Sequence, residues 1–196
     1  MPITINPAAI GVAGLVLLLL LILAVRLVRS RQRRIRREAN PRKITLRDID
    51  LMEDGSEFEL YLFRLFSELG YSEVYQTTAS RDFGADLVFT DREGRRHVLQ
   101  AKRYSYSNPV GLGAVQEVYT SMRYYEAERA IVLTSGRYTE ACRTLAAVNG
   151  VKLLDREDLE DLISLFKGRR YGEAMNVIEE LPEIKAPHWR PRKNQR

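Results

Sequence analysis

The stretch RDFGADLVFTDREGRRHVLQAKRY, residues 81–104, decides how the rest of the chain is arranged. Residues 87–90 and 97–101 are rich in residues that favour strands, and residues 91–94 between them have the composition of a turn. If the hairpin folds about Glu93, residues whose numbers sum to roughly 186 face each other across the two strands. The sequence therefore predicts an antiparallel hairpin at the centre of the fold.

Polar side chains meet at one end of this hairpin. Asp86 is expected opposite, or nearly opposite, Gln100. Because side chains alternate along a strand, Gln100 and Lys102 share one face, while Ala101 points the other way. A carboxylate, an amide oxygen and an ammonium group in one place suit a hard metal ion beside an activated water.

The spacing of an Asp, thirteen residues and then Gln-Ala-Lys resembles the PD-(D/E)xK nuclease superfamily. Within it the chain is similar to the Mrr-like (type IV restriction endonuclease) branch, in which Gln commonly replaces the middle acid. The resemblance covers about residues 54–166. It extends to the segments GSEFE (55–59), LGY (69–71), DFGAD (82–86), NPVG (108–111), AVQEVY (114–119) and AIVLTS (130–135).

The resemblance implies further members of the site. Glu59 matches the helix glutamate that completes the metal site in that family, and Gln116 matches a position that approaches the active site. The resemblance also implies Mg²⁺ or Mn²⁺ as cofactor and double-stranded DNA as partner. From sequence alone, Glu59 is nearly as compatible with an ordinary exposed helical glutamate.

Phosphodiester hydrolysis requires a nucleophilic water, a positioned phosphate and relief of charge on the leaving oxygen. Asp86 would supply an anionic metal ligand, Gln100 a neutral amide oxygen, and Ala101 its backbone carbonyl. Lys102 would orient the water or stabilise the phosphate in the transition state. The alternatives for single residues are a turn-capping Asp86 and a surface Lys102, but their joint placement favours the site.

Hydrophobic periodicity predicts an α/β fold, a mixed sheet flanked by helices, in the order αβββαβαβα. The family that the chain resembles has a fold of this form, so the resemblance implies a restriction-endonuclease-like fold. A single transmembrane helix is expected to precede it. The expected helices are residues 56–69, 111–125, 139–148 and 156–166, and the expected strands are residues 73–78, 87–90, 97–101, 130–134 and 151–154.

The N-terminal region indicates a membrane anchor. Residues 8–25 are apolar throughout, and the stretch 8–28 is long enough to cross a bilayer core of about 30 Å. Residues 26–43 contain nine Arg or Lys and one acid, which under the positive-inside rule stay in the cytoplasm. We expect an extracytoplasmic N-terminus (1–7), a span (8–28) and a basic linker (29–53). This topology puts the chain in the inner (plasma) membrane, against lipid, with the nuclease domain (54–166) in the cytoplasm.

The net negative charge of the expected domain argues against strong DNA binding. Residues 44–166 contain fourteen basic and twenty-one acidic side chains, whereas duplex affinity depends largely on phosphate neutralisation. Arg81, Arg103 and the loop residue Tyr104 are the DNA-binding candidates, although each is also compatible with ordinary surface packing. The basic tail (167–196) is expected to be partly helical and then disordered.

Other chemistries find little support. A single Cys142 excludes an intramolecular disulfide and a thiolate metal cluster, and only His97 and His188 could serve in a histidine-based site. No Walker-type phosphate loop is present. His97 alternates away from Gln100 and is expected to be a structural or surface residue.

The resulting hypothesis is a membrane-anchored, Mg²⁺-dependent DNA endonuclease that restricts foreign or modified DNA. One alternative is a nuclease-fold module without activity that tethers DNA or a protein partner to the membrane; the acidic domain and the neutral Gln100 favour it. Another is a structure-selective DNA repair nuclease with the same site. A homodimer would supply two active sites for a double-strand cut.

Overall fold

The computed structural model describes residues 16–27, 30, 40–77 and 83–186, in two units, Met1–Glu38 and Ala39–Arg196. In the first unit, residues 16–27 are helical and their apolar side chains are exposed. The expected membrane span at 8–28 lies partly outside the described residues. Among the described residues, no helix is both long and apolar enough to cross a bilayer.

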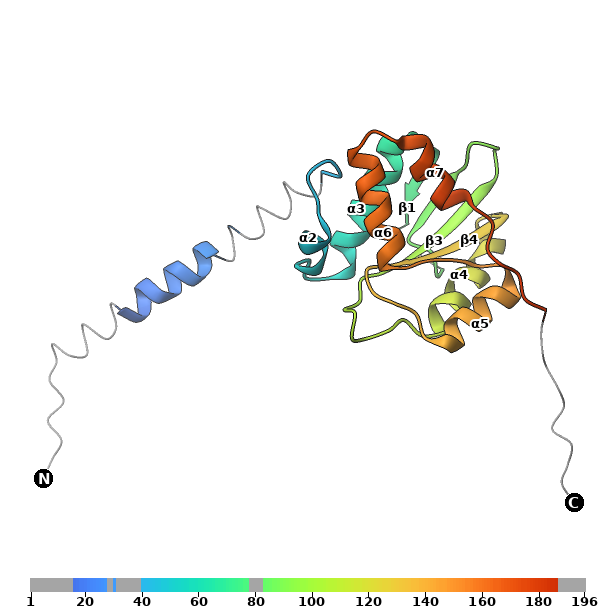
Figure 1. The fold of residues 1–196 in the computed structure, drawn as a ribbon. Helices are drawn as coiled ribbons and strands as arrows, with labels where there is room; N and C mark the ends of the chain where they lie inside the picture. The colour runs from blue at the N-terminus through green and yellow to red at the C-terminus, as the bar shows by residue number, and fades with distance from the viewer. Residues whose placement is uncertain (1–15, 28–29, 31–39, 78–82, 187–196) are drawn as a thin grey trace, which may run out of the picture. The chain divides into compact units, whose positions relative to one another are not determined.

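The second unit is built on a five-stranded mixed sheet in the order β1-β2-β3-β4-β5 (Figure 1). Strand β2 is antiparallel to its neighbours β1 and β3, and β4 and β5 continue parallel to β3. The strands are β1 (Ser72–Gln76), β2 (Leu87–Thr90), β3 (Arg96–Lys102), β4 (Arg129–Thr134) and β5 (Lys152–Leu154).

The central hairpin has the register that the sequence predicts. Leu87 pairs with Leu99 and Val88 with Val98, so partner numbers sum to 186. On its other side β3 pairs in parallel with β4, which places Lys102 beside Thr134. Strand β3 is therefore central in the sheet, with β2 on one side and β4 on the other.

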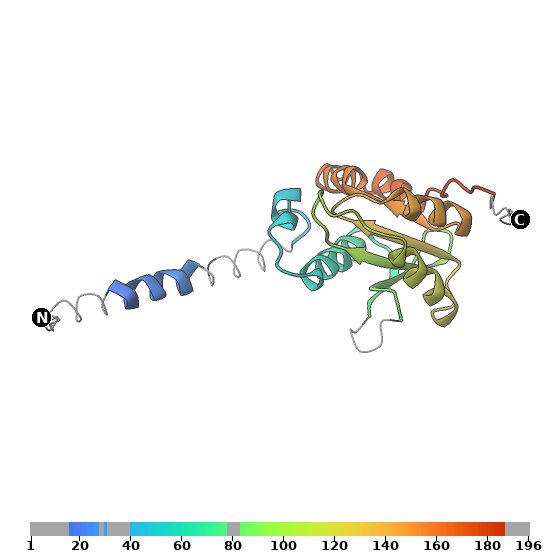
Figure 2. The same ribbon diagram turned by 90° about the horizontal axis from the view of Figure 1, so that it is seen from below.

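Helices cover both faces of this sheet, as expected. In Figures 1 and 2, α3 (Gly55–Leu69), α6 (Arg156–Lys167) and α7 (Tyr171–Glu179) gather on one face, and α4 (Gly113–Tyr124) and α5 (Glu140–Asn149) on the other. The order from α3 to α6 is αβββαβαβα, so the expected order of elements is confirmed.

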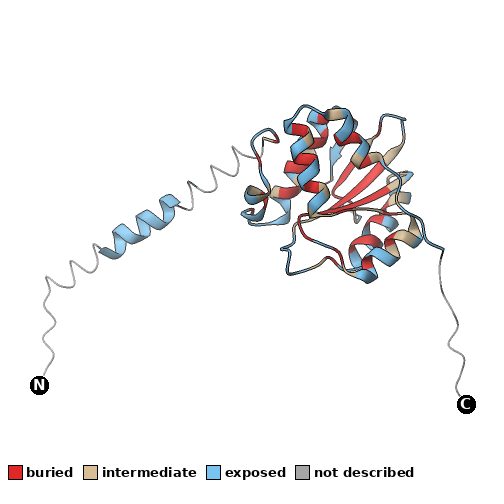
Figure 3. Cartoon of the chain, viewed as in Figure 1, coloured by how far each residue is buried: buried red, intermediate tan, exposed pale blue. Residues whose placement is uncertain are grey.

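Alternation along the strands divides the core between the two faces. Phe89 points to the α3 side, where its ring centroid lies 4.9 Å from that of Phe66. Val88 and Val98 point to the other side and form a buried cluster with Val115 and Val118 of α4. Figure 3 shows how much of the sheet is buried between the two helical layers.

The compact unit extends beyond residues 54–166 in both directions. A short helix, α2 (Leu46–Asp50), lies inside the stretch expected to be a linker. Ile49 within this helix and Ile44 just before it are fully buried. At the other end, α7 lies inside the expected tail and buries Ala174 and Ile178.

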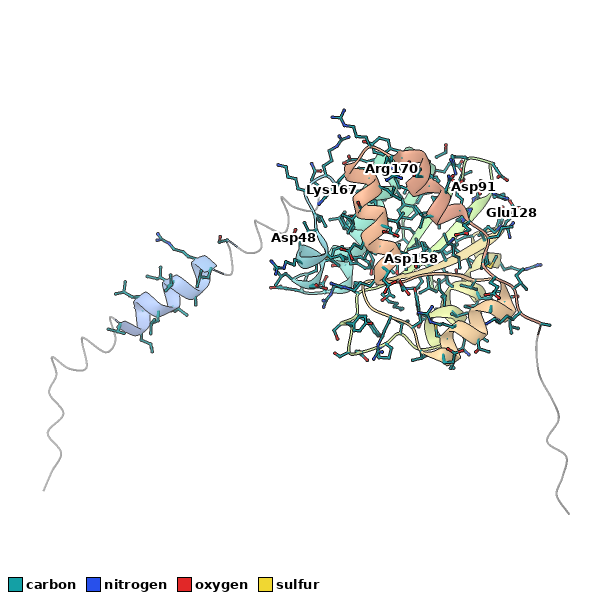
Figure 4. The ribbon with its side chains drawn as sticks, in the orientation of Figure 1. Asp48, Asp91, Glu128, Asp158, Lys167 and Arg170 are labelled. Atoms are coloured by element: carbon teal, nitrogen blue, oxygen red, sulfur yellow. The ribbon has the colours of Figure 1, made fainter. Side chains whose placement is uncertain are left out.

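The turn of the central hairpin is organised by Asp91, labelled in Figure 4. Its carboxylate accepts hydrogen bonds from the backbone N–H groups of Glu93 (2.8 Å) and Arg95 (2.9 Å), from Arg95 Nε (2.9 Å) and from His97 Nε2 (2.9 Å). Burial raises the pKa of Asp91, but these donors outweigh it and hold the pKa well below its usual range. His97 is buried and stacks on Phe89, so it is a structural residue.

Candidate functional site

Asp86 lies immediately before β2, where its backbone N–H still donates to Leu99 O at 2.8 Å. The Asp86 side chain also contacts strand β3. Its Oδ2 accepts a hydrogen bond from Ala101 N and another from Gln100 Nε2, both at 2.6 Å. Asp86 and Gln100 are each only 6% exposed. The hairpin register thus brings together the two residues that the sequence places opposite each other.

The orientation of Gln100 differs from the expectation. The sequence argument assigned its amide oxygen to a metal ion, whereas here its NH₂ group faces the Asp86 carboxylate. The reason is electrostatic, because an ionised carboxylate only accepts hydrogen bonds and draws the donor end of the amide. A cation bound by Asp86 would reverse this preference, and the amide can present its oxygen by turning about its last bond.

The backbone of Ala101 adds an oxygen on the same side. Backbone groups alternate in direction along a strand, so the Ala101 carbonyl leaves β3 toward β2, as does its N–H group, which donates to Asp86. A carboxylate, an amide oxygen and a carbonyl oxygen are the hard ligands that Mg²⁺ and Mn²⁺ accept. The donor set therefore fits a hard divalent cation that keeps several of its waters.

Glu59 is half-buried on the first turns of α3. A Cβ atom placed on Gly55 would lie 3.5 Å from Glu59 Oε1, so this carboxylate is turned toward the start of its own helix. Among the described residues there is no group of three or more His, Cys, Asp or Glu side chains arranged for a metal ion. Glu59 as a metal ligand therefore stays a prediction.

Lys102 ends β3 on the face shared with Gln100. Its Nζ lies 2.8 Å from Oε2 of Glu117 on α4, in a pair whose side chains are 23% and 49% exposed. The backbone oxygen of Lys102 accepts hydrogen bonds from Thr134 Oγ1 (2.6 Å) and Ser135 N (3.2 Å). The lysine is thus fixed from the backbone by β4 and from the side chain by α4.

Glu117 is the residue that sequence reasoning missed. The neighbouring Gln116 was the candidate, but it is exposed on α4 while Glu117 contacts Lys102. Two positions on a helix one residue apart differ by about 100° around the axis, so a helical pattern alone leaves such a choice open. The role of Gln116 stays a prediction.

The loop that leads into Asp86 is packed directly against α4. Gly84 has a φ of +90°, and a Cβ atom there would lie 2.4 Å from the backbone oxygen of Glu117. Because glycine has no Cβ, it permits this close approach to the helix backbone. This contact holds α4 over the sheet face that carries Asp86 and Gln100.

The structure places the three DNA-binding candidates in different surroundings or, for one, does not describe it. Arg81 lies outside the described residues. Arg103 Nη2 is 3.4 Å from Glu53 O, and its Nε is buried with no hydrogen-bond partner among the residues that the structure describes. The side chain of Tyr104 is exposed, while its backbone N–H and C=O both bond Ser135 Oγ at 3.0 Å.

The fold and the site together define the class. A mixed sheet flanked by helices, whose central hairpin carries Asp86 and the Gln100-Ala101-Lys102 sequence, is a restriction-endonuclease-like domain. The Mrr catalytic-domain model, described as a restriction endonuclease, matches residues 51–163, more than half of the chain. The chain belongs to this family. No curated protein matches the sequence.

Solved structures match this chain at low sequence identity. The DNA modification-dependent restriction endonuclease AspBHI is 17% identical over 68% of this chain and 37% of its own, with a TM-score of 0.46. The MspJI restriction endonuclease, solved with a 27-mer oligonucleotide, is 19% identical over 76% of this chain and 38% of its own, also at 0.46. A protein of unknown function, AF1548, is 19% identical over 61% and 91%, at 0.39. The chain thus spans less than two fifths of the two restriction enzymes.

Proposed function

We propose that this protein is a metal-dependent DNA endonuclease that restricts modified or foreign DNA. The observation that carries the proposal is the convergence of Asp86, Gln100, the Ala101 backbone and Lys102 at the end of one hairpin. Membership of the Mrr catalytic family supports the same reaction class. A structural hairpin would need none of these polar groups at a buried position.

Asp86, the amide oxygen of Gln100 and the carbonyl of Ala101 would hold Mg²⁺ or Mn²⁺. When bound, such an ion lowers the pKa of a coordinated water and neutralises charge on the phosphate. The chain's own contribution is to fix these oxygens on two paired strands, so that little reorganisation is required. Because Gln100 is neutral, we expect weaker metal affinity than a site with two acids would give.

Lys102 is the group that would act on the phosphate. Its ammonium lies on the Gln100 face, beyond the oxygens proposed to hold the metal ion, where it can stabilise the growing negative charge. Its pairing with Glu117 positions the flexible side chain before substrate arrives. Cleavage of both strands would use two such sites, and we propose a homodimer for that step.

The test is a cleavage assay with the full chain in mild detergent, on methylated and unmethylated supercoiled plasmid with Mg²⁺ or Mn²⁺. Asp86→Asn is the informative variant, because it removes the charge but retains one acceptor for the Ala101 N–H group. Asp86→Ala would leave that buried donor unpaired, at about 1–3 kcal/mol of stability. Lys102→Met keeps the aliphatic stem and removes the ammonium.

Metal-dependent nicking that disappears in Asp86→Asn and Lys102→Met, with unchanged thermal unfolding, supports the enzyme. Glu160→Gln, an exposed change on α6, is the matched control and should cleave normally. Absence of both cleavage and calorimetric metal binding would overturn the proposal. The acidic domain and the Gln100 amide facing Asp86 would then favour a module that tethers DNA or a protein partner.

We also propose that the chain is anchored in the inner membrane, with the nuclease domain in the cytoplasm. The support is the apolar run at 8–25 followed by the nine basic residues of 26–43. Residues 16–27 are helical and expose several leucines to solvent, an arrangement that water disfavours. Alkaline extraction should leave the full chain in the membrane pellet, and release into the supernatant would contradict anchoring.

A further inference from the structure

Several aromatic rings stand exposed on the sheet face that carries the candidate site. Phe83 is 53% exposed, Tyr124 59% and Tyr75 60%. Phe83 and Tyr124 lie almost face to face, with ring centroids 4.1 Å apart and planes 33° apart. Tyr125 meets Tyr124 edge-on at 4.9 Å. Exposed rings grouped in this way are unusual on a surface that contacts only water.

Tyr75, Tyr124 and Tyr125 line a hollow of about 520 Å³, a size typical of small-ligand sites, and Phe83 packs against Tyr124 beside it. Val88 of β2 contributes its apolar wall, and polar groups of Gln76 and Arg96 lie around it. The residues that line it are Tyr75, Gln76, Thr77, Val88, Arg96, Tyr124, Tyr125 and Glu126.

The hollow lies beside the candidate active site. Val88, which lines the hollow, is two residues beyond Asp86 along the chain and on the same face of the sheet, so the two positions are about 7 Å apart. Thr77, which also lines the hollow, donates its N–H to Asp86 O at 2.9 Å and its hydroxyl to Ala85 O at 2.6 Å. A ligand in the hollow would therefore lie next to any phosphate held at Asp86.

The backbone of Phe83 is strained. Its φ is +31°, a conformation that bulky residues rarely adopt. The following residue, Gly84, packs against the backbone of Glu117, which holds this segment on α4. Residues with a strained backbone concentrate at binding and catalytic sites. Here the strained backbone of Phe83 places its ring against the face of Tyr124.

Charge at the hollow favours a flat, neutral ligand over an anionic one. Arg96 lies 3.7 Å from Glu73 and 3.9 Å from Glu126, so its charge is shared with two carboxylates. Ring faces with adjacent amide and hydroxyl groups match the stacking surface and the polar edge of a nucleobase. Bases within a duplex have both faces covered, so the base must be unpaired or turned out of the helix.

We propose that this hollow, between Tyr75 and Tyr124, receives one unpaired base of the DNA strand whose phosphate lies at Asp86. The inference rests on the proposed function, since it takes DNA as the ligand. The base stacks on the Tyr124 ring from the side of the hollow, and Phe83 packs against that ring and holds it in place. Substrate choice is then set partly by how easily a base next to the cleaved phosphate leaves its pair.

The experiment uses the full chain in mild detergent with EDTA, so that binding is measured without cleavage. The probe is a duplex with one extrahelical 2-aminopurine, whose fluorescence falls when the base stacks, beside the same duplex fully paired. Phe83→Ala and Tyr124→Ala should each weaken binding of the bulged duplex about tenfold, in line with the loss of one stacked base. The quenching should be lost as well. Phe83→Tyr and Tyr124→Phe, which keep a ring, should restore both signals.

Tyr119→Ala is the matched control, because Tyr119 is an exposed tyrosine of the same helix and does not line the hollow. Unchanged affinity and quenching in both ring-removing variants, with thermal unfolding intact, would overturn the proposal. So would a change in sedimentation of the DNA-free protein on removing the rings, since a second copy would then cover the hollow. The proposed function is judged separately: Asp86→Asn should retain the base-dependent quenching while losing metal-dependent cleavage.

Discussion

Lys102 Nζ lies 2.8 Å from Glu117 Oε2, an ion pair that joins the end of the central strand to the helix covering it. The two residues are fifteen positions apart, with a loop and the start of α4 between them. Gly84, on the segment before Asp86, packs against the backbone of the same glutamate. Helix α4 is therefore the element that fixes Lys102 and the approach to Asp86 relative to each other.

Removal of the Glu117 carboxylate should impair catalysis more than substrate binding. In Glu117→Ala the Lys102 side chain loses its partner, and we expect kcat to fall about ten- to a hundredfold, the range for misplaced catalytic groups, with KM little changed. Glu117→Gln retains an oxygen that accepts from Lys102 and should recover most of the rate. Steady-state nicking assays measure both constants, and an equal loss in the two variants would indicate that charge matters more than position.

A second carboxylate at position 100 should make stability depend on metal. Gln100→Glu places an acid where the Gln100 amide now lies 2.6 Å from Asp86, and two carboxylates that close repel each other when ionised. We expect the metal-free variant to unfold at least about 2–4 °C below the parent, the shift that about 1 kcal/mol produces in a chain of this size. Saturating Mg²⁺ should raise its Tm more than it raises that of the parent.

Differential scanning calorimetry with and without Mg²⁺ gives this comparison. Gln76→Glu, an equal change at an exposed position of β1, should show no added response to metal. Identical Mg²⁺ responses in Gln100→Glu and the parent would remove position 100 from the metal site.

A side chain at position 84 should separate α4 from the sheet. Gly84→Ala combines a φ of +90° with a Cβ only 2.4 Å from Glu117 O, where backbone must move to make room. We expect a loss of about 2–4 kcal/mol, the sum of the conformational and overpacking costs. Gly113→Ala, at the start of α4, is the control. The added Cβ atom meets nothing within 4 Å, so the free energy of unfolding should be nearly unchanged or slightly higher. Chemical denaturation of the two variants side by side measures the difference.

The stability of the hairpin should decline in mild acid because of His97. Burial lowers the pKa of His97, and the hydrogen bond to Asp91 only partly offsets it. The unfolded chain, whose histidines titrate near 6.5, then binds the proton more tightly than the folded protein. This contribution to stability is complete above about pH 6.5 and is lost as the pH falls below that value.

Thermal unfolding followed between about pH 8 and pH 5 tests this, because the histidine range lies within it. His97→Gln keeps a hydrogen-bond donor for Asp91 and cannot titrate, so its Tm should fall less steeply with decreasing pH. A parent and a variant with parallel profiles would show that His97 titrates in the folded protein as in the unfolded chain.

Much of the fold follows from local pattern. The alternation in residues 87–90 and 97–101 determined the register of the hairpin and hence the meeting of Asp86 with Gln100. The N-terminal cap of α5 is equally local, because the Thr139 side chain accepts a hydrogen bond from Cys142 N. These features depend on backbone geometry and near neighbours in the chain, which the sequence states directly.

What the sequence alone determined is the hairpin, the order of the elements and the identity of the residues at its polar end. Only the tertiary structure decided that Glu117 contacts Lys102, that Gly84 packs against α4, and that Gln100 turns its NH₂ group to Asp86. Each of these depends on where α4 lies across the sheet or on the balance of charge at a buried carboxylate. Such relationships join residues through packing in space, and a linear pattern with a period of two or of 3.6 does not encode them.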